Sequence, residues 1–251
     1  MSHAVLGALA GLVQLALGFL LQAARVGLDA VVFRPLPWPG VADALFAWSR
    51  TLAFAGLAIA LVSGALAQLW PSVADARASR AWSGLFVRAA AGVVLVAGVP
   101  DAVRILLDLN NGAVAALAAG GFAPDAWSPG ILAGAPLLIL GLVAGLTALV
   151  GYLTLLYAVR AVRLYWSTAL LPWFVLHWLA TGNGRRLADA LKEILVLIFS
   201  QTAQAMGWWL TVRLLGEVKD IGGLLLAAGG LWFMARVPST LRQLAGLTGR
   251  V

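Results

Sequence analysis

Three charged residues lie at helical spacing in a stretch that is otherwise apolar. Asp101, Arg104 and Asp108 are separated by three and four residues, so on a helix they share one face and could form an Asp–Arg–Asp ladder. Ionisable side chains at membrane depth are costly and face a partner, a cavity or water. One interpretation is a contact between subunits or a polar pore lining. The other is a solvated helix end at the outer membrane–water interface, because Pro100 and the Asn-Asn-Gly sequence at 110–112 allow the helix to end there.

Two glutamines are the other polar candidates. Gln201 and Gln204 lie within an apolar run, where amide side chains can hydrogen-bond to a neighbouring helix or to another subunit. We therefore group them with the charged ladder as candidate polar or inter-subunit contacts.

Catalytic and metal-binding chemistry finds little support in the residue types. The chain has no cysteine, which excludes disulfides, iron–sulfur clusters, thiolate zinc sites and cysteine nucleophiles. Its two histidines, His3 and His177, are too far apart for a local metal-binding motif. No Ser/His/Asp or paired-carboxylate constellation stands out. We predict a protein that is not an enzyme and that has no catalytic, cofactor-binding or metal site.

The elements that position these residues are membrane helices. Of the 251 residues, 62% are hydrophobic and 11% are charged, whereas a soluble domain is about one quarter charged. A spanning helix needs roughly 20 apolar residues. The sequence therefore predicts an all-α, polytopic integral membrane protein with five to seven membrane segments. The predicted runs are residues 4–21, 44–70, 84–108, 131–158, 166–180, 193–212 and 221–235.

The run at 166–180 differs from the others. It is short and contains Pro172, which predicts a Pro-broken, short or re-entrant element. Most Arg and Lys residues fall on the cytoplasmic side only if this run re-enters the membrane without crossing it, as the positive-inside rule favours. The same rule predicts contacts with anionic lipid phosphates for a group of basic residues near segment ends: Arg160, Arg163, Arg185, Arg186 and Lys192.

The predicted organisation has three parts. Residues 1–108 form the N-terminal membrane helices, residues 109–130 a polar loop that contains Gly and Pro, and residues 131–251 the C-terminal membrane helices.

From Arg160 onward the motifs follow one another in an order that can be compared with that of a known protein family. A basic pair comes first, followed by a Pro-interrupted apolar run, a Gly-Asn-Gly turn, a basic helix start, a Phe-x-Gln-x-x-Gln-Ala stretch and a Val-Pro-x-x-Leu-Arg tail. The residues concerned are Arg160, Arg163, 169–175, 182–184, Arg185, Arg186, 199–205 and 237–242. In this stretch of about 90 residues the chain resembles the TrbL family of polytopic membrane proteins of conjugation and type IV secretion machines.

This resemblance implies a non-enzymatic channel or scaffold component in the bacterial inner membrane. It implies a homo-oligomer that assists transfer of DNA or protein, or assembly of a pilus. Its implied partners are a stalk protein, a pilin, an assembly ATPase and DNA in transit. The alternative is a solute transporter or channel subunit, although the chain has only weak internal symmetry.

Overall fold

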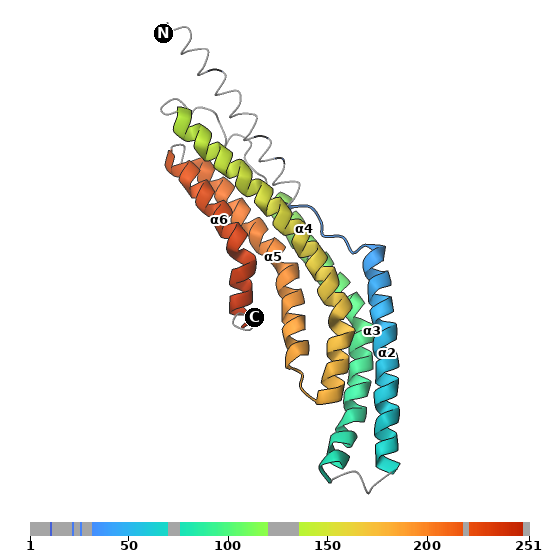
Figure 1. Cartoon of the computed structure of the whole chain (residues 1–251). Helices are drawn as coiled ribbons and strands as arrows, with labels where there is room; N and C mark the ends of the chain where they lie inside the picture. The colour runs from blue at the N-terminus through green and yellow to red at the C-terminus, as the bar shows by residue number, and fades with distance from the viewer. Residues whose placement is uncertain are drawn as a thin grey trace. The chain divides into compact units, whose positions relative to one another are not determined.

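The computed structural model is helical throughout its regular elements (Figure 1). The all-α prediction is confirmed for the residues that the structure describes, which are Gly11, Gln22, Val26, 32–69, 76–119, 136–217 and 221–247. Nearly all of the predicted first segment, residues 4–21, lies outside these residues. The helices are α2 (Gly40–Leu69), α3 (Ala76–Ala119), α4 (Pro136–Thr181), α5 (Arg185–Glu217) and α6 (Ile221–Leu244).

Helix α4 joins two predicted segments into one. It has 46 residues and continues through Pro172, so the prediction of a separate Pro-broken or re-entrant element at 166–180 is wrong. A proline inside a helix removes one backbone hydrogen bond, but neighbouring helices can satisfy the carbonyls that it frees. Ser49 of α2 donates a hydrogen bond to the carbonyl oxygen of Ala169, three residues before Pro172, which ties α4 to α2 beside the proline.

Helix α3 is also longer than the sequence predicts. It runs for 44 residues through Pro100 and through the Asn-Asn-Gly sequence at 110–112. The predicted helix end after the charged ladder is therefore wrong, and residues 109–119 of the predicted polar loop are helical. The remainder of that loop, residues 120–130, lies outside the described residues. The asparagines do not end the helix because their side chains bond to other segments, as shown below.

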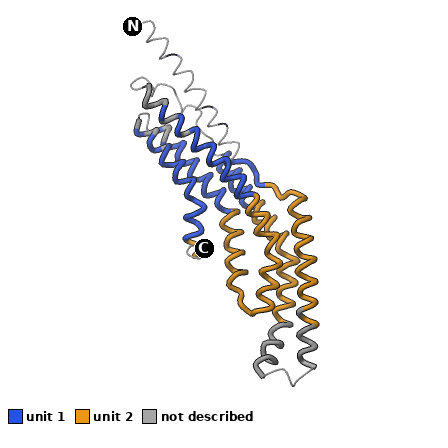
Figure 2. Tube along the Cα trace, in the orientation of Figure 1, with its two compact units in different colours: residues 1–36, 109–161, 199–243 blue, residues 37–108, 162–198, 244–251 orange. Residues whose placement is uncertain are grey.

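Residues far apart in the sequence gather into two compact units (Figure 2). Unit 1 comprises residues 1–36, 109–161 and 199–243, and unit 2 comprises residues 37–108, 162–198 and 244–251. Helices α3, α4 and α5 each contribute residues to both units. The core of unit 1 is formed by large side chains from several segments, including Val32, Val114, Leu153, Trp208 and Met234.

Two stretches of the described helices are long and apolar enough to cross a membrane. They are Val87–Ala119 in α3 and Thr147–Thr181 in α4. Only 28% and 22% of their most apolar windows are buried within the protein, whereas a core helix of a soluble protein is mostly buried. Apolar side chains that face outward in this way suit contact with lipid and indicate membrane association.

Helices α5 and α6 approach closely in unit 1 at two glycines. A Cβ atom on Gly230 would overlap with Oγ1 of Thr211, and one on Gly207 would lie 3.2 Å from Cγ of Met234. Thr211 is buried and β-branched, and its hydroxyl donates to the carbonyl oxygen of Gly207 at 2.7 Å. Its side chain therefore has little freedom to move away.

We expect Gly230→Ala to destabilise the protein, because overpacking a well-packed contact costs about 1–3 kcal/mol. The adjacent Gly229→Ala is the matched control, since a Cβ there meets no atom within 4 Å. Alanine also favours a helix over glycine by about 1 kcal/mol. Thermal unfolding in detergent should give a lower midpoint for Gly230→Ala and an equal or higher midpoint for Gly229→Ala. Equal midpoints for the two variants would contradict the close approach of α5 and α6.

Candidate functional site

A non-helical segment at residues 33–39 precedes α2. Its sequence, Phe-Arg-Pro-Leu-Pro-Trp-Pro, places proline at every second position, and each proline fixes its own backbone and disfavours the helical conformation of the residue before it. Because the segment is not helical, its carbonyls have no partners within a helix. In apolar surroundings each of these carbonyls needs another donor.

Asn111 of α3 binds the backbone of this segment through both ends of its amide. The N–H group of Leu36 donates to Oδ1 of Asn111 at 3.0 Å, and Nδ2 of Asn111 donates to the carbonyl oxygen of Leu36 at 3.2 Å. Leu36 itself is buried. A side-chain amide thus takes the place of a neighbouring backbone, which fixes the segment against α3.

Gln201 of α5 binds the backbone at the start of this segment and at the residue before it. Its Nε2 atom donates to the carbonyl oxygens of Val32 at 3.1 Å and Arg34 at 2.7 Å. Its Oε1 atom accepts from Nδ2 of Asn110 at 3.0 Å, and Oδ1 of Asn110 accepts from the Thr202 hydroxyl at 2.8 Å. Both Gln201 and Asn110 are completely buried. Their amides therefore link α3, α5 and the non-helical segment in one network.

Arg160 of α4 lies inside unit 1. Its side chain is buried, its Nη1 atom donates to Oε1 of Gln204 at 3.3 Å, and its guanidinium lies 4.1 Å from the centre of the Tyr157 ring. The Tyr157 hydroxyl donates in turn to the carbonyl oxygen of Val32 at 3.3 Å. The prediction that Arg160 contacts lipid phosphates does not agree with this burial. The face of an aromatic ring attracts a guanidinium, which offsets part of the cost of burying this charge.

Gln204 satisfies a carbonyl that a proline leaves open. Helix α6 contains Pro238, which has no N–H group to donate to the carbonyl of Met234 four residues earlier. Nε2 of Gln204 donates to that oxygen at 3.0 Å. The side chains of Gln204 and Met234 are both buried. This hydrogen bond thus replaces the one that Pro238 cannot form, and it joins α5 to α6.

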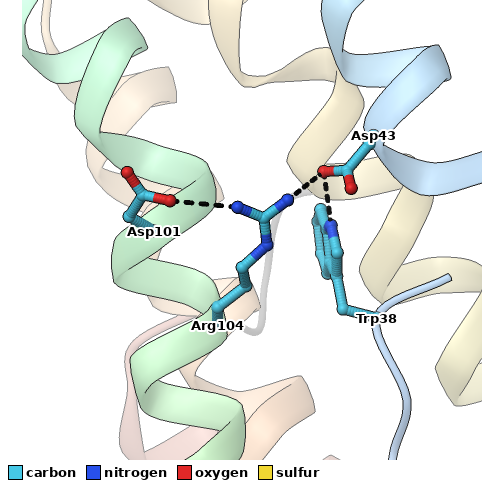
Figure 3. Close-up of polar contacts among 4 residues, drawn as sticks. All are labelled: Trp38, Asp43, Asp101 and Arg104. Atoms are coloured by element: carbon cyan, nitrogen blue, oxygen red, sulfur yellow. Dashed lines mark hydrogen bonds and ion pairs between the residues drawn. The ribbon is translucent and has the colours of Figure 1, made fainter. Parts of the chain in front are cut away.

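Unit 2 contains the charged residues of the predicted ladder, but Arg104 pairs with Asp101 and with Asp43 of another helix (Figure 3). Arg104 forms an ion pair with Asp101 at 3.0 Å and a second one with Asp43 of α2 at 2.5 Å. Nε1 of Trp38 also donates to Asp43, at 2.7 Å. The side chains of Arg104, Asp43 and Asp101 are 42%, 44% and 74% exposed. The cluster is therefore at the surface of unit 2 and not in its core.

The outcome for the predicted ladder is mixed. The structure brings Asp101 and Arg104 together, while Asp108 is exposed and the ion pairs recorded for Arg104 in the described part of the chain go to Asp101 and Asp43. Asp43 was missed because it is 61 residues from Arg104 in the sequence. The acidic first turn of α2 is the signal that could have drawn attention to it.

The N-terminal side of the cluster is held by aromatic residues. The ring centres of Trp38 and Tyr165 are 5.9 Å apart in an edge-on arrangement, and the Tyr165 hydroxyl donates to the carbonyl oxygen of Pro37 at 2.5 Å. The carbonyl of Pro39 accepts from the N–H group of Ala42 at 2.8 Å, which starts α2. These contacts fix the direction in which α2 leaves the non-helical segment.

The remaining predicted lipid contacts lie in unit 2. Arg163 pairs with Glu193 at 3.3 Å, and about half of its side chain is exposed. Arg185, Arg186 and Lys192 are exposed near the start of α5. A phosphate could reach all three, so their contact with lipid stays a prediction.

The chemistry of the site is hydrogen bonding by neutral amides. Among the residues that the structure describes, no group of three His, Cys, Asp or Glu side chains could hold a metal ion. The amides of Asn110, Asn111, Gln201 and Gln204 are used to bind backbone and one another. Of these four, the sequence analysis identified the glutamines and missed the asparagines, which it interpreted as a place where the helix ends.

Replacing Gln204 by Leu should destabilise the protein, and removing the proline should reduce that cost. In the wild type the change leaves the buried Met234 carbonyl without its donor, which costs about 1–3 kcal/mol. In a Pro238→Ala background the introduced alanine has a backbone N–H group that can donate to that carbonyl. We therefore expect a smaller loss for Gln204→Leu in this background, measured as the free energy of unfolding in detergent.

The matched control is Gln243→Leu, because Gln243 is an exposed glutamine on α6. It should change the unfolding free energy little in either background. An equal cost for Gln204→Leu with and without Pro238 would contradict the proposed repair of the helix.

Similarity to known proteins gives no independent assignment of this site. No protein family, no curated protein and no solved structure matches the chain. What the site does is therefore inferred from its own contacts, in which buried amides hold non-helical and proline-interrupted backbone between helices.

Proposed function

We propose that this chain is a non-enzymatic scaffold or channel component of a type IV secretion or conjugation machine. It crosses the bacterial inner membrane several times, forms a homo-oligomer and assists transfer of DNA or protein, or assembly of a pilus. The observation that carries the proposal is the hydrogen bond between Gln204 and the carbonyl of Met234.

That hydrogen bond joins two separate parts of the resemblance to the TrbL family. Gln204 belongs to the Phe-x-Gln-x-x-Gln-Ala stretch, and the open carbonyl of Met234 results from Pro238 in the Val-Pro-x-x-Leu-Arg tail. Short apolar motifs that matched by coincidence would have no reason to depend on each other physically. Here one motif supplies the donor that the other motif requires, which supports a shared origin for both.

The distribution of apolar surface supports a membrane location. Large apolar side chains such as Val94, Val162 and Trp232 are more than half exposed on their helices. Lipid is the solvent in which such outward apolar faces are stable. The exposed Arg185, Arg186 and Lys192 fit contact with anionic phospholipids at the cytoplasmic surface.

The alternative, a solute transporter, usually relies on interrupted helices whose open carbonyls bind a substrate or ion. In unit 1 the carbonyls of Val32, Arg34 and Leu36 already accept hydrogen bonds from Tyr157, Gln201 or Asn111. Backbone that is bound to the protein's own side chains is suited to holding a scaffold together. The same reasoning favours a role in assembly with a stalk protein, a pilin and an assembly ATPase.

Deleting the gene from the bacterium that encodes it should abolish conjugative transfer or secretion, with restoration by the wild-type gene. The protein purified from membranes in mild detergent should be a closed oligomer that carries other secretion subunits. The measurements are transfer frequency and native mass spectrometry of the purified complex.

Gln243→Leu is the matched control for complementation, since it should restore transfer as well as the wild type does. Gln201→Leu removes donors from two backbone carbonyls and should restore transfer poorly. Unchanged transfer in the deletion strain would exclude the proposed function. A monomer that a small solute stabilises would instead support transport.

A further inference from the structure

Five charged residues form a strip along one side of unit 2. Helix α2 contributes Asp43 and Arg50, which are seven residues apart, and α3 contributes Asp101, Arg104 and Asp108, which are three and four apart. Residues at these spacings lie on one face of a helix. The ion pair between Arg104 and Asp43 brings the two faces together (Figure 3). We call these five residues the charged strip.

The charged strip lies among exposed apolar side chains. Val41 and Trp48 of α2 are 78% and 62% exposed, and Ile105 of α3 is 67% exposed. Arg50, Asp101 and Asp108 are themselves exposed. Charges in such a setting are costly in lipid and mark a surface that meets a polar partner. The strip contains both signs of charge, so a partner must be able to match both.

We propose that the charged strip is the contact between two copies of this chain, related by a twofold axis parallel to α2 and α3. This inference rests on the proposed membrane oligomer and names the surface that forms it. Copies inserted into a membrane with the same orientation keep each residue at its own depth. A twofold axis along the membrane normal therefore brings α2 of one copy against α3 of the other at equal depth.

The order of charges along the two helices is complementary under this symmetry. Helices α2 and α3 are antiparallel, because Asp43 contacts Arg104 while Ala53 and Leu57 share a small cavity with Gly92 and Val96. Asp43 of one copy is thus level with Arg104 of the second copy, and opposite charges meet.

The other members of the strip also find opposite charges. Arg50 lies about 10 Å beyond Asp43 along α2, and Asp101 lies about 4.5 Å beyond Arg104 in the same direction. The difference of about 6 Å is within reach of an arginine side chain. In the opposite direction Asp108 is level with the start of α2 in the second copy, where the positive end of the helix dipole favours a carboxylate. Each charge of the strip therefore has a counterpart in a second copy.

Disulfide crosslinking between two single-cysteine chains tests the contact, because the natural sequence has no cysteine. Ala47 and Ala97 lie on the same helix faces as the strip, so Ala47→Cys and Ala97→Cys leave all five charges in place. Membranes that contain both chains should give a crosslinked dimer on mild oxidation. Since each chain has one cysteine, such a product can form only between copies.

Trp166→Cys is the matched position control. Trp166 is 57% exposed on α4, and the contact of Ser49 with Ala169 places it close to the depth of Ala47. It should not crosslink with Ala47→Cys. Adding Arg50→Glu to the Ala47→Cys chain should reduce the yield of dimer several-fold, whereas the exposed Lys192→Glu should leave the yield unchanged.

The outcomes separate this inference from the proposed function. An oligomer that gives no Ala47–Ala97 crosslink, or equal crosslinking to Trp166→Cys, overturns the interface and leaves the scaffold proposal intact. A crosslink that Arg50→Glu does not weaken overturns the role of the charges. A chain that is monomeric by native mass spectrometry from the same membranes overturns both proposals.

Discussion

The arrangement of unit 1 depends on one constraint: every backbone carbonyl enclosed by apolar side chains needs a hydrogen-bond donor. Regular helices meet this need internally, and the long apolar helices of this chain do so for most of their length. The need remains where prolines interrupt the pattern. At these points the chain places buried amides, which carry no net charge and can donate and accept at once.

Two of the proline sites are repaired in the same manner. The non-helical segment at 33–39 is held by Asn111 and Gln201, and the carbonyl opened by Pro238 is held by Gln204. In each case the donor comes from a different helix, so the bond that satisfies the backbone also fixes the packing of neighbouring elements. Irregular backbone thereby becomes a specific link between helices, since removing either partner would leave a buried polar group unsatisfied.

The sequence predicts the helical class and the polar role of the glutamines, because apolar runs and isolated amides are local signals. Helix ends at residues 110–112 and a break at Pro172 were predicted from the same local rules and are wrong. Asn110 and Asn111 bond to Gln201 and Leu36, and Ser49 bonds next to Pro172. Asp43 was missed for the same reason. These partners are distant in the sequence, so residue spacing gave no access to them.

The chain places the neutral amides of unit 1 and the ion pairs of unit 2 differently, although it also buries one charged side chain, Arg160, over the ring of Tyr157 in unit 1. The four amides of unit 1 form their hydrogen bonds inside the protein. The side chains of Arg104, Asp43 and Asp101 are instead 42% to 74% exposed at the surface of unit 2. Burying an amide that is fully hydrogen-bonded costs little, while an ion pair recovers its desolvation cost only with good geometry and further hydrogen bonds. The packing of the helices in unit 1 therefore does not depend on charged side chains at the protein surface. The charges that remain on an apolar surface are better explained by contacts that the chain makes with another molecule than by its own stability.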